Sequence, residues 1–178
     1  MSVTELACQR AREIRLMAFD IDGVMTDGTL YYHADGGESK AFNVLDGHGL
    51  KMLRQGGIAV AIISGRASPA LAARAANLGL TETLRMGVQD KRAELVALAQ
   101  ACQLPLRACG YMGDDVVDLP ILRAAGFSAA PANAHAFVKE HVHWVSQARG
   151  GAGAVREVCE FLLQAQGKLA AMLQEYLQ

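Results

Sequence analysis

Two aspartates, Asp20 and Asp22, stand at a spacing that could support chemistry. They follow the apolar run RLMAF and precede Gly23. In extended backbone, residues two apart point to the same side, so both carboxylates can face one reacting group. One carboxylate can attack a phosphorus atom, while the other gives a proton to the leaving group and then takes one from water. The pair predicts hydrolysis of a phosphate monoester, with Asp20 as the nucleophile and Asp22 as the acid/base residue.

Polar side chains also follow later apolar runs. Ser64 and Gly65 come after IAVAII, Lys91 begins a helical stretch, and Asp114 comes soon after RACGYM. Crowded carboxylates repel one another unless a cation joins them, and oxygen ligands favour Mg²⁺, so we expect Asp20 and Asp114 to bind magnesium. The hydroxyl of Ser64 and the ammonium of Lys91 would hold the phosphoryl oxygens as negative charge builds on them.

These groups need a scaffold that gathers them, and the hydrophobic pattern indicates one. Short apolar runs alternate with longer stretches of helical period. The runs expected as strands are residues 15–19, 58–63, 83–86, 107–112, 127–130 and 143–145. The stretches expected as helices are residues 47–55, 69–78, 91–102, 116–124 and 134–139. This alternation predicts an α/β fold with a doubly wound, Rossmann-like parallel sheet, whose ligands bind at the carboxyl ends of the strands.

Two segments depart from this alternation. Residues 29–44 hold two β-prone runs around a DGG turn, which predicts a small β-hairpin insertion. Residues 149–153 are rich in glycine and predict a flexible hinge before one C-terminal helix over about residues 154–176. We expect the whole chain, residues 1–178, to form one domain.

Composition excludes several classes of protein. The 178 residues are 52% hydrophobic and 20% charged, and a formal net charge of −1 gives no sign of a nucleic-acid surface. The four cysteines form no C-x-x-C pair, so neither a zinc site nor a disulfide is expected. No signal-peptide pattern begins the chain, and no apolar run reaches the roughly 18 residues that span a bilayer. We therefore expect a cytoplasmic protein that binds a small anionic substrate.

Four motifs, in this order, resemble those of the haloacid dehalogenase-like phosphohydrolases. They are DIDGVMTDG from Asp20, SGR from Ser64, the single Lys91, and GDDxxD from Gly113. The resemblance implies an aspartyl-phosphate intermediate on Asp20. It also implies that Mg²⁺ takes the backbone carbonyl of Asp22 as a further ligand.

Neighbours of the catalytic residues are expected to assist them. The expected substrate-binding residues are Gly23, Thr26, Gly65 and Arg66. A guanidinium at Arg66 suits a carboxylate of the substrate, and a structural salt bridge is the alternative. Asp115 is expected to orient the metal's water ligands or the catalytic lysine, whereas Asp118 could equally be an acid in the first turn of a helix. Asp27 is expected to stabilise its turn, with a role in substrate specificity as the alternative, and Asp46 is expected to cap its own helix.

The chain leaves no room for the cap domain that many members insert, because only the hairpin separates Asp27 from Asp46. Capless members that act on small sugar phosphates are tetramers, so the resemblance implies a homotetramer in which a neighbour covers each site. The stretches KAFNVLDGHGL, SGRAS and GGAGAVREVCEFLLQAQGKL are similar to the branch that acts on an eight-carbon sugar-acid phosphate in lipopolysaccharide synthesis. In that branch the glycine-rich tail reaches toward an active site.

Two other functions stay open. A phosphatase of a nine-carbon, sialic-acid-type 9-phosphate would share every catalytic motif. A phospho-signalling receiver domain also combines a parallel sheet, an acidic magnesium site and a lysine. Its phosphorylated aspartate ends the third strand, however, and here that strand ends near Met86 without an aspartate.

Overall fold

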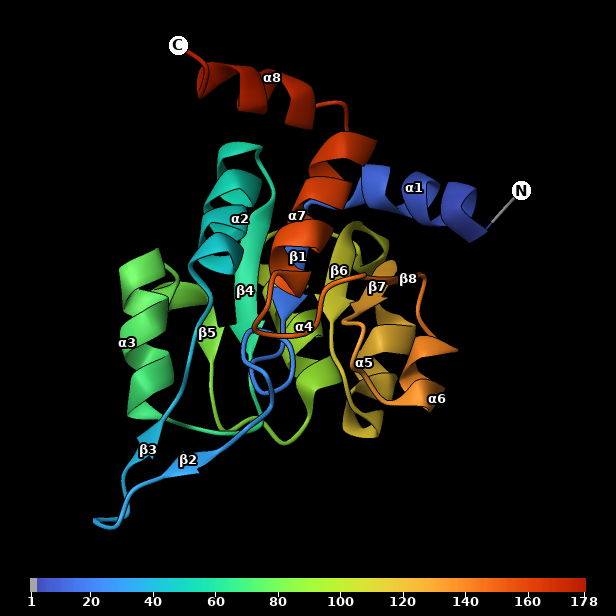
Figure 1. Ribbon diagram of the computed structural model, residues 1–178. Helices are drawn as coiled ribbons and strands as arrows, with labels where there is room; N and C mark the ends of the chain where they lie inside the picture. Colours follow the sequence, from blue (N-terminus) through green and yellow to red (C-terminus); the bar gives the residue numbers. More distant parts are fainter. Residues whose placement is uncertain (1–2) are drawn as a thin grey trace.

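The computed structural model describes residues 3–178, and a six-stranded parallel sheet forms its centre (Figure 1). In spatial order the strands are β5 (Leu84–Arg85), β4 (Ala59–Ile63), β1 (Leu16–Phe19), β6 (Cys109–Met112), β7 (Phe127–Ala130) and β8 (Trp144–Val145). The chain thus builds outward from β1 in one direction and then in the other. This reversal leaves a crevice at the carboxyl ends of β1 and β6, where ligands of doubly wound sheets bind. The predicted fold class is confirmed.

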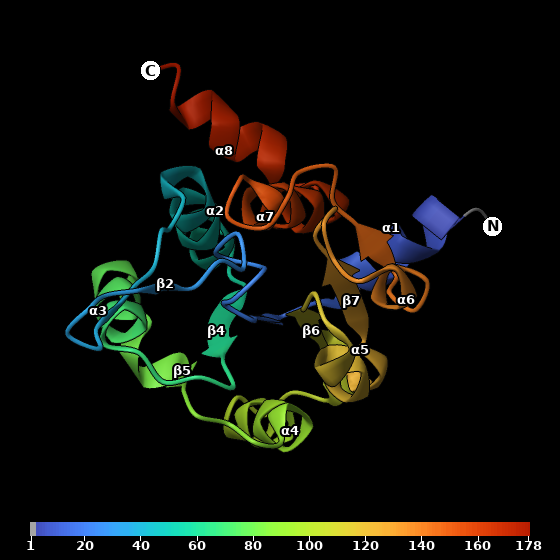
Figure 2. The same ribbon diagram turned by 60° about the horizontal axis from the view of Figure 1, so that its bottom comes forward.

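Helices cover both faces of the sheet (Figure 2). Side chains that alternate along the strands fill two cores, one on each face. Met17 and Phe19 of β1 lie in the first core, and Leu16 and Ala18 lie in the second. The first face carries α1 (Val3–Glu13), α2 (Val44–Gln55), α3 (Pro69–Leu78) and α7 (Ala154–Ala165), and the second carries α4 (Lys91–Ala101), α5 (Leu119–Ala124) and α6 (Ala136–Lys139). The short 3₁₀ turns are η1 (Thr81–Thr83), η2 (Leu106–Ala108) and η3 (Val116–Asp118). Burial on both faces explains why the strands are continuous apolar runs.

A β-hairpin lies between β1 and α2, with β2 (Tyr31–Tyr32) antiparallel to β3 (Glu38–Ser39). It projects from the edge of the sheet at which the strands end (Figure 1). Gly36 has φ +84°, the left-handed conformation that its tight turn requires. The predicted hairpin is confirmed, although each paired strand is only two residues long.

The C-terminal helix differs from its prediction. In place of one helix, α7 ends at Ala165 and α8 (Leu169–Glu175) begins after a turn at Gly167, whose φ is +71°. A left-handed residue cannot continue a right-handed helix. Lys168 Nζ, which donates to Gly56 O at 2.6 Å, ties this turn to the end of α2.

Helix α1 was not predicted. Its buried positions include Ala7 and Ala11, which give only a weak apolar stripe in a largely polar segment, and it packs against α7. Within residues 3–178, no helix combines the length and apolar character needed to cross a membrane. The predicted domain of residues 1–178 includes Met1 and Ser2, which lie outside the described residues.

Candidate active site

Asp20 lies at the switch point of the sheet. It follows β1 directly, and its N–H donates to Met112 O at 3.0 Å, which extends the pairing of β1 with β6. Asp20 is 8% exposed, and its Oδ2 is 2.9 Å from Lys91 Nζ. The predicted nucleophile therefore lies in the crevice, beside the predicted phosphate-binding lysine.

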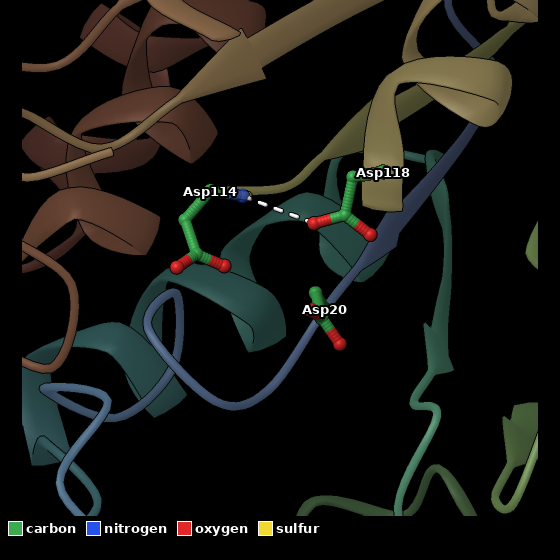
Figure 3. Close-up of side chains that lie close together, drawn as sticks. All are labelled: Asp20, Asp114 and Asp118. Carbon is green, nitrogen blue, oxygen red and sulfur yellow. Dashed lines mark hydrogen bonds between the residues drawn. The ribbon is translucent and has the colours of Figure 1, made fainter. Parts of the chain in front are cut away.

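Three carboxylates converge there. Asp20, Asp114 and Asp118 each offer an oxygen, and these oxygens lie within 4.8 Å of one another (Figure 3). Burial, followed by repulsion from Asp118, raises the pKa of Asp20 to about 6. Burial, followed by repulsion from Asp20, Asp118 and Asp115, raises the pKa of Asp114 to about 7. A hard divalent cation would offset this repulsion, so the cluster suits such an ion.

Lys91 is the first residue of α4, which Asp90 begins by accepting a hydrogen bond from Ala93 N at 3.0 Å. Its ammonium is 2.7 Å from Asp118 Oδ1 as well as close to Asp20. Burial acts to lower the pKa of Lys91, but the two carboxylates outweigh it and raise that pKa. The lysine is therefore held as a cation between the carboxylates of Asp20 and Asp118.

Asp118, rather than Asp115, orients this lysine. The side chain of Asp118 is fully buried and accepts from the backbone N–H of Asp114 and from Tyr111 Oη. Asp115 instead turns back on its own backbone and accepts from Val116 N at 2.7 Å. Of the two roles expected of Asp115, contact with the lysine is not the one the structure shows, because η3 brings Asp118, three positions later, back into the site. Orientation of the metal's water ligands by Asp115 stays a prediction.

The loop after β1 shapes the front of the cluster. Gly23 has φ +90°, and a Cβ built there would lie 2.0 Å from Asp114 Oδ2. Glycine thus lets the backbone of this loop come close to the Asp114 carboxylate, and the expected role of Gly23 in substrate binding stays a prediction. Thr26 does not reach the crevice as predicted, because it is 2% exposed and its Oγ1 accepts from the N–H groups of Gly23 and Gly28. Asp27 stabilises the turn by accepting from Thr29 N.

The loop after β4 places the predicted hydroxyl and guanidinium. Ser64 is buried, and its Oγ accepts from Arg66 N at 3.2 Å. Gly65 lies beside Lys91, since a Cβ there would be in van der Waals contact with Val88 O at 3.7 Å and with the lysine's Cε at 3.9 Å. The Arg66 side chain makes a salt bridge to Glu38 Oε2 at 2.5 Å, which is the structural alternative, and its contact with a substrate carboxylate stays a prediction.

The hairpin brings two charged residues to the site that the sequence analysis missed. Lys40 Nζ contacts Asp22 Oδ1, and it also lies 3.1 Å from Glu38 Oε1. Hydrogen bonds, first from Arg66 and then from Lys40, hold the pKa of Glu38 below its usual range. Glu38 and Lys40 are visible in the sequence as charged residues beside AFN, but only the fold of the hairpin shows that they lie next to Asp22.

The glycine-rich segment before α7 is held against the same loop. Gly151 N donates to Val24 O at 3.0 Å, and a Cβ on Gly150 would lie 1.8 Å from Gly23 O. Asp46 fixes the segment's far end, since its carboxylate accepts from Arg156 N at 2.8 Å. The expected cap of Asp46 on its own helix is therefore wrong. Asn43 caps α2 instead, and Asp46 caps α7.

Known proteins resemble this chain in both sequence and structure. A sequence model described as haloacid dehalogenase-like hydrolase matches residues 86–157. The 3-deoxy-D-manno-octulosonate 8-phosphate phosphatase of Yersinia pestis is 44% identical over 167 residues, which are 94% of this chain and 89% of that protein. A structure described as a probable YrbI-family phosphatase of Pseudomonas syringae has a TM-score of 0.95 at 47% identity, over 98% of both chains.

A further structure is informative about ligands. It is the 3-deoxy-D-manno-octulosonate 8-phosphate phosphatase of Moraxella catarrhalis, in complex with magnesium, phosphate and KDO. Its TM-score is 0.93 at 39% identity, over 98% of this chain and 99% of that one.

Fold, site and relatives define a haloacid dehalogenase-like hydrolase that has a hairpin in place of a cap domain. Within that class, the chain belongs to the family of 3-deoxy-D-manno-octulosonate 8-phosphate phosphatases. The receiver-domain alternative is contradicted, because β5 ends at Arg85 with no aspartate and the relatives are phosphatases.

Proposed function

We propose that this chain hydrolyses 3-deoxy-D-manno-octulosonate 8-phosphate to the free sugar acid and phosphate, with magnesium, in lipopolysaccharide synthesis. One observation carries the proposal above all. Asp20, Lys91 and the acidic pair of Asp114 and Asp118 meet at the switch point of the sheet, in a chain 44% identical to a phosphatase of that name.

In the first half-reaction, an oxygen of Asp20 would attack phosphorus, and the bond from phosphorus to the sugar oxygen would break. Asp22 would give its proton to that leaving oxygen. Ser64 and Lys91 would hold the phosphoryl oxygens, on which negative charge builds in the transition state. The product would be the free sugar acid and an aspartyl-phosphate on Asp20.

In the second half-reaction, Asp22 would take a proton from a water molecule. The water oxygen would bond to phosphorus, the bond to Asp20 would break, and phosphate would leave. Asp20 and Asp114, with the backbone carbonyl of Asp22, would hold Mg²⁺, which when bound neutralises clustered carboxylates and phosphoryl oxygens. Asp118 already binds Lys91 and accepts from the backbone N–H groups of Asp114 and Asp115. It would therefore hold these neighbours in position and would not itself bind the metal.

A panel of sugar phosphates tests the proposal. Phosphate release should require magnesium and should stop with excess chelator. We expect kcat/KM for the eight-carbon 8-phosphate to exceed that for a sialic-acid-type 9-phosphate by about tenfold or more. The opposite preference would favour the nine-carbon alternative, and no release from any sugar phosphate would contradict the activity itself.

We also propose a cytoplasmic homotetramer. The hairpin and the start of α2 expose the apolar side chains of Leu30, Tyr31, Tyr32, Val44 and Leu45. A neighbouring hairpin could bury these side chains and cover the open crevice, since large exposed apolar groups favour association. Sedimentation equilibrium should give the mass of four chains, and a monomer at micromolar concentration would contradict the assembly.

A further inference from the structure

Lys40 is a buried lysine beside the proposed acid/base residue. It follows β3, and its side chain is only 2% exposed. Its ammonium contacts Asp22 Oδ1 and lies 3.1 Å from Glu38 Oε1. On the other side of the carboxylate, Arg66 Nε lies 3.6 Å from Asp22 Oδ2. The two oxygens of Asp22 thus face two cations that different elements supply.

The burial of Lys40 requires an explanation. Removing water from an ammonium is costly unless carboxylates replace that water, and most lysine side chains keep their charged end in solvent. Lys40 is instead enclosed between Asp22 and Glu38, which is itself bound to Arg66. This arrangement connects the hairpin directly to the Asp22 carboxylate.

We propose that Lys40 is a positioning residue that orients Asp22 to take a proton from water in the second half-reaction. A carboxylate that two cations contact has its remaining lone pairs fixed in direction, and fixed direction speeds proton transfer. In that step the water oxygen bonds to phosphorus, the bond to Asp20 breaks, and the water's proton moves to Asp22. The inference rests on the proposed function, because Lys40 acts through Asp22 in the same reaction.

Two other roles for Lys40 make different predictions. As a ligand of the phosphoryl group it would duplicate Lys91, whose ammonium already lies 2.9 Å from Asp20. Its loss would then slow formation of the phospho-enzyme. As a support for the hairpin alone, it would affect both half-reactions alike. If Lys40 orients Asp22, its loss should slow hydrolysis of the phospho-enzyme. Formation of the phospho-enzyme should be little changed when the leaving group needs no proton.

The test uses p-nitrophenyl phosphate with magnesium, because p-nitrophenolate leaves without a proton and makes little demand on Asp22. Rapid quenching follows release of p-nitrophenolate and decay of the phospho-enzyme separately. In Lys40→Met, we expect decay to be about 10- to 100-fold slower than in the wild type. Release should then show a burst whose rate changes less than about threefold. Lys40→Arg, which keeps a cation, should recover most of the decay rate.

Lys51→Met is the matched control, since Lys51 is an exposed lysine of α2, and it should behave as the wild type. Unchanged decay in Lys40→Met, or equal slowing of both steps, would overturn the proposal. Rate constants of a single turnover do not depend on the folded fraction. If Lys40→Met does not fold at all, Glu38→Gln replaces it as the test, because Glu38 contacts the Lys40 ammonium. We expect slower decay of the phospho-enzyme in this variant, and unchanged decay would overturn the proposal.

Failure of the proposed substrate can be recognised separately. One outcome is that the wild-type enzyme fails to hydrolyse 3-deoxy-D-manno-octulosonate 8-phosphate and still forms a phospho-enzyme from p-nitrophenyl phosphate. That result would contradict only the proposed substrate. The phospho-enzyme lifetimes of the wild type and of Lys40→Met would still decide the role of Lys40.

Discussion

Different kinds of contact hold the carboxyl edge of the sheet and the two segments that pack against it, the hairpin and the glycine-rich segment before α7. At the edge, Asp20, Lys91 and Asp118 contact one another from positions that strand ends and a helix start dictate. The hairpin and the glycine-rich segment are held by contacts from elsewhere, such as Lys40 to Asp22 and Asp46 to Arg156 N. The groups proposed to carry the chemistry thus lie at positions that local structure fixes, while contacts between residues distant in sequence set the direction of the neighbouring side chains. Variants at this edge should therefore reduce activity most. Variants in the hairpin or in contact with the glycine-rich segment should change stability, or the rate of one step of the reaction.

The largest effect is expected for Asp20→Asn. Loss of the nucleophile should reduce kcat by about 10⁴-fold or more. The metal-free variant should melt at the same temperature or higher, because a buried carboxylate repelled by Asp118 becomes neutral. Phosphate release and thermal unfolding measure the two effects. Activity within tenfold of the wild type would remove Asp20 from the mechanism.

Gly23→Ala should come next, because it acts where the loop meets the carboxylates. The added Cβ would lie 2.0 Å from Asp114 Oδ2, so the loop or the Asp114 carboxylate must move and kcat should fall about 100-fold. Gly36→Ala is the matched control, since Gly36 has a similar φ of +84° but nothing within 4 Å of its Cβ position. Both variants should lose about 1 kcal/mol of stability from the left-handed backbone. Equal activities of the two variants would contradict the close approach.

Asp46→Asn should separate stability from chemistry. The amide can accept fewer of the N–H groups at the start of α7, whereas burial raises the pKa of Asp46, so the loss of its charge offsets part of this cost. The free energy of unfolding should therefore fall by about 1 kcal/mol. The value of kcat should change less than about tenfold, since Asp46 lies outside the crevice. Asp35→Asn, at an exposed aspartate that accepts from Gly37 N, should cost much less. Urea unfolding measures both variants, and equal losses would argue against the cap on α7.

The smallest effect concerns metal-free enzyme. In the folded protein, the pKa of Asp20 is raised to about 6 and that of Asp114 to about 7, both above the unfolded value of 3.8. The folded state therefore binds more protons between about pH 4 and pH 7, and stability should fall as pH rises through this window. With chelator, the melting temperature should be lower at pH 7.5 than at pH 5.5 by a few degrees. Asp114→Asn should reduce this difference, and an unchanged difference would contradict the cause.

The sequence predicted the residues at the carboxyl edge of the sheet but not the contacts of the hairpin and of the glycine-rich segment, for a physical reason. Asp20, Ser64, Lys91 and Asp114 follow apolar runs or begin a helix, so local pattern and parallel topology suffice to gather them. Asp46 caps a helix whose contacted N–H lies 110 residues away. No local signal distinguishes that contact from a cap on its own helix.

The same limit explains the errors within the motifs. Asp115 caps the short 3₁₀ turn that Asp118 ends, and only the folded geometry of this turn shows which carboxylate meets Lys91. Thr26 is polar and close to the catalytic pair in sequence, yet the loop folds it inward. Residue type and spacing predict which segments reach a site, while side-chain direction within a loop depends on tertiary contacts.

The most direct measurement locates the phosphoryl group. The enzyme is mixed with substrate and magnesium, quenched in acid within one turnover, and digested for mass spectrometry. The phosphoryl group should be on the peptide that carries Asp20, and it should be absent from Asp20→Asn treated alike. A phosphoryl group on Asp114 or Asp118, or turnover of the wild type with no phospho-enzyme at any quench time, would contradict the account.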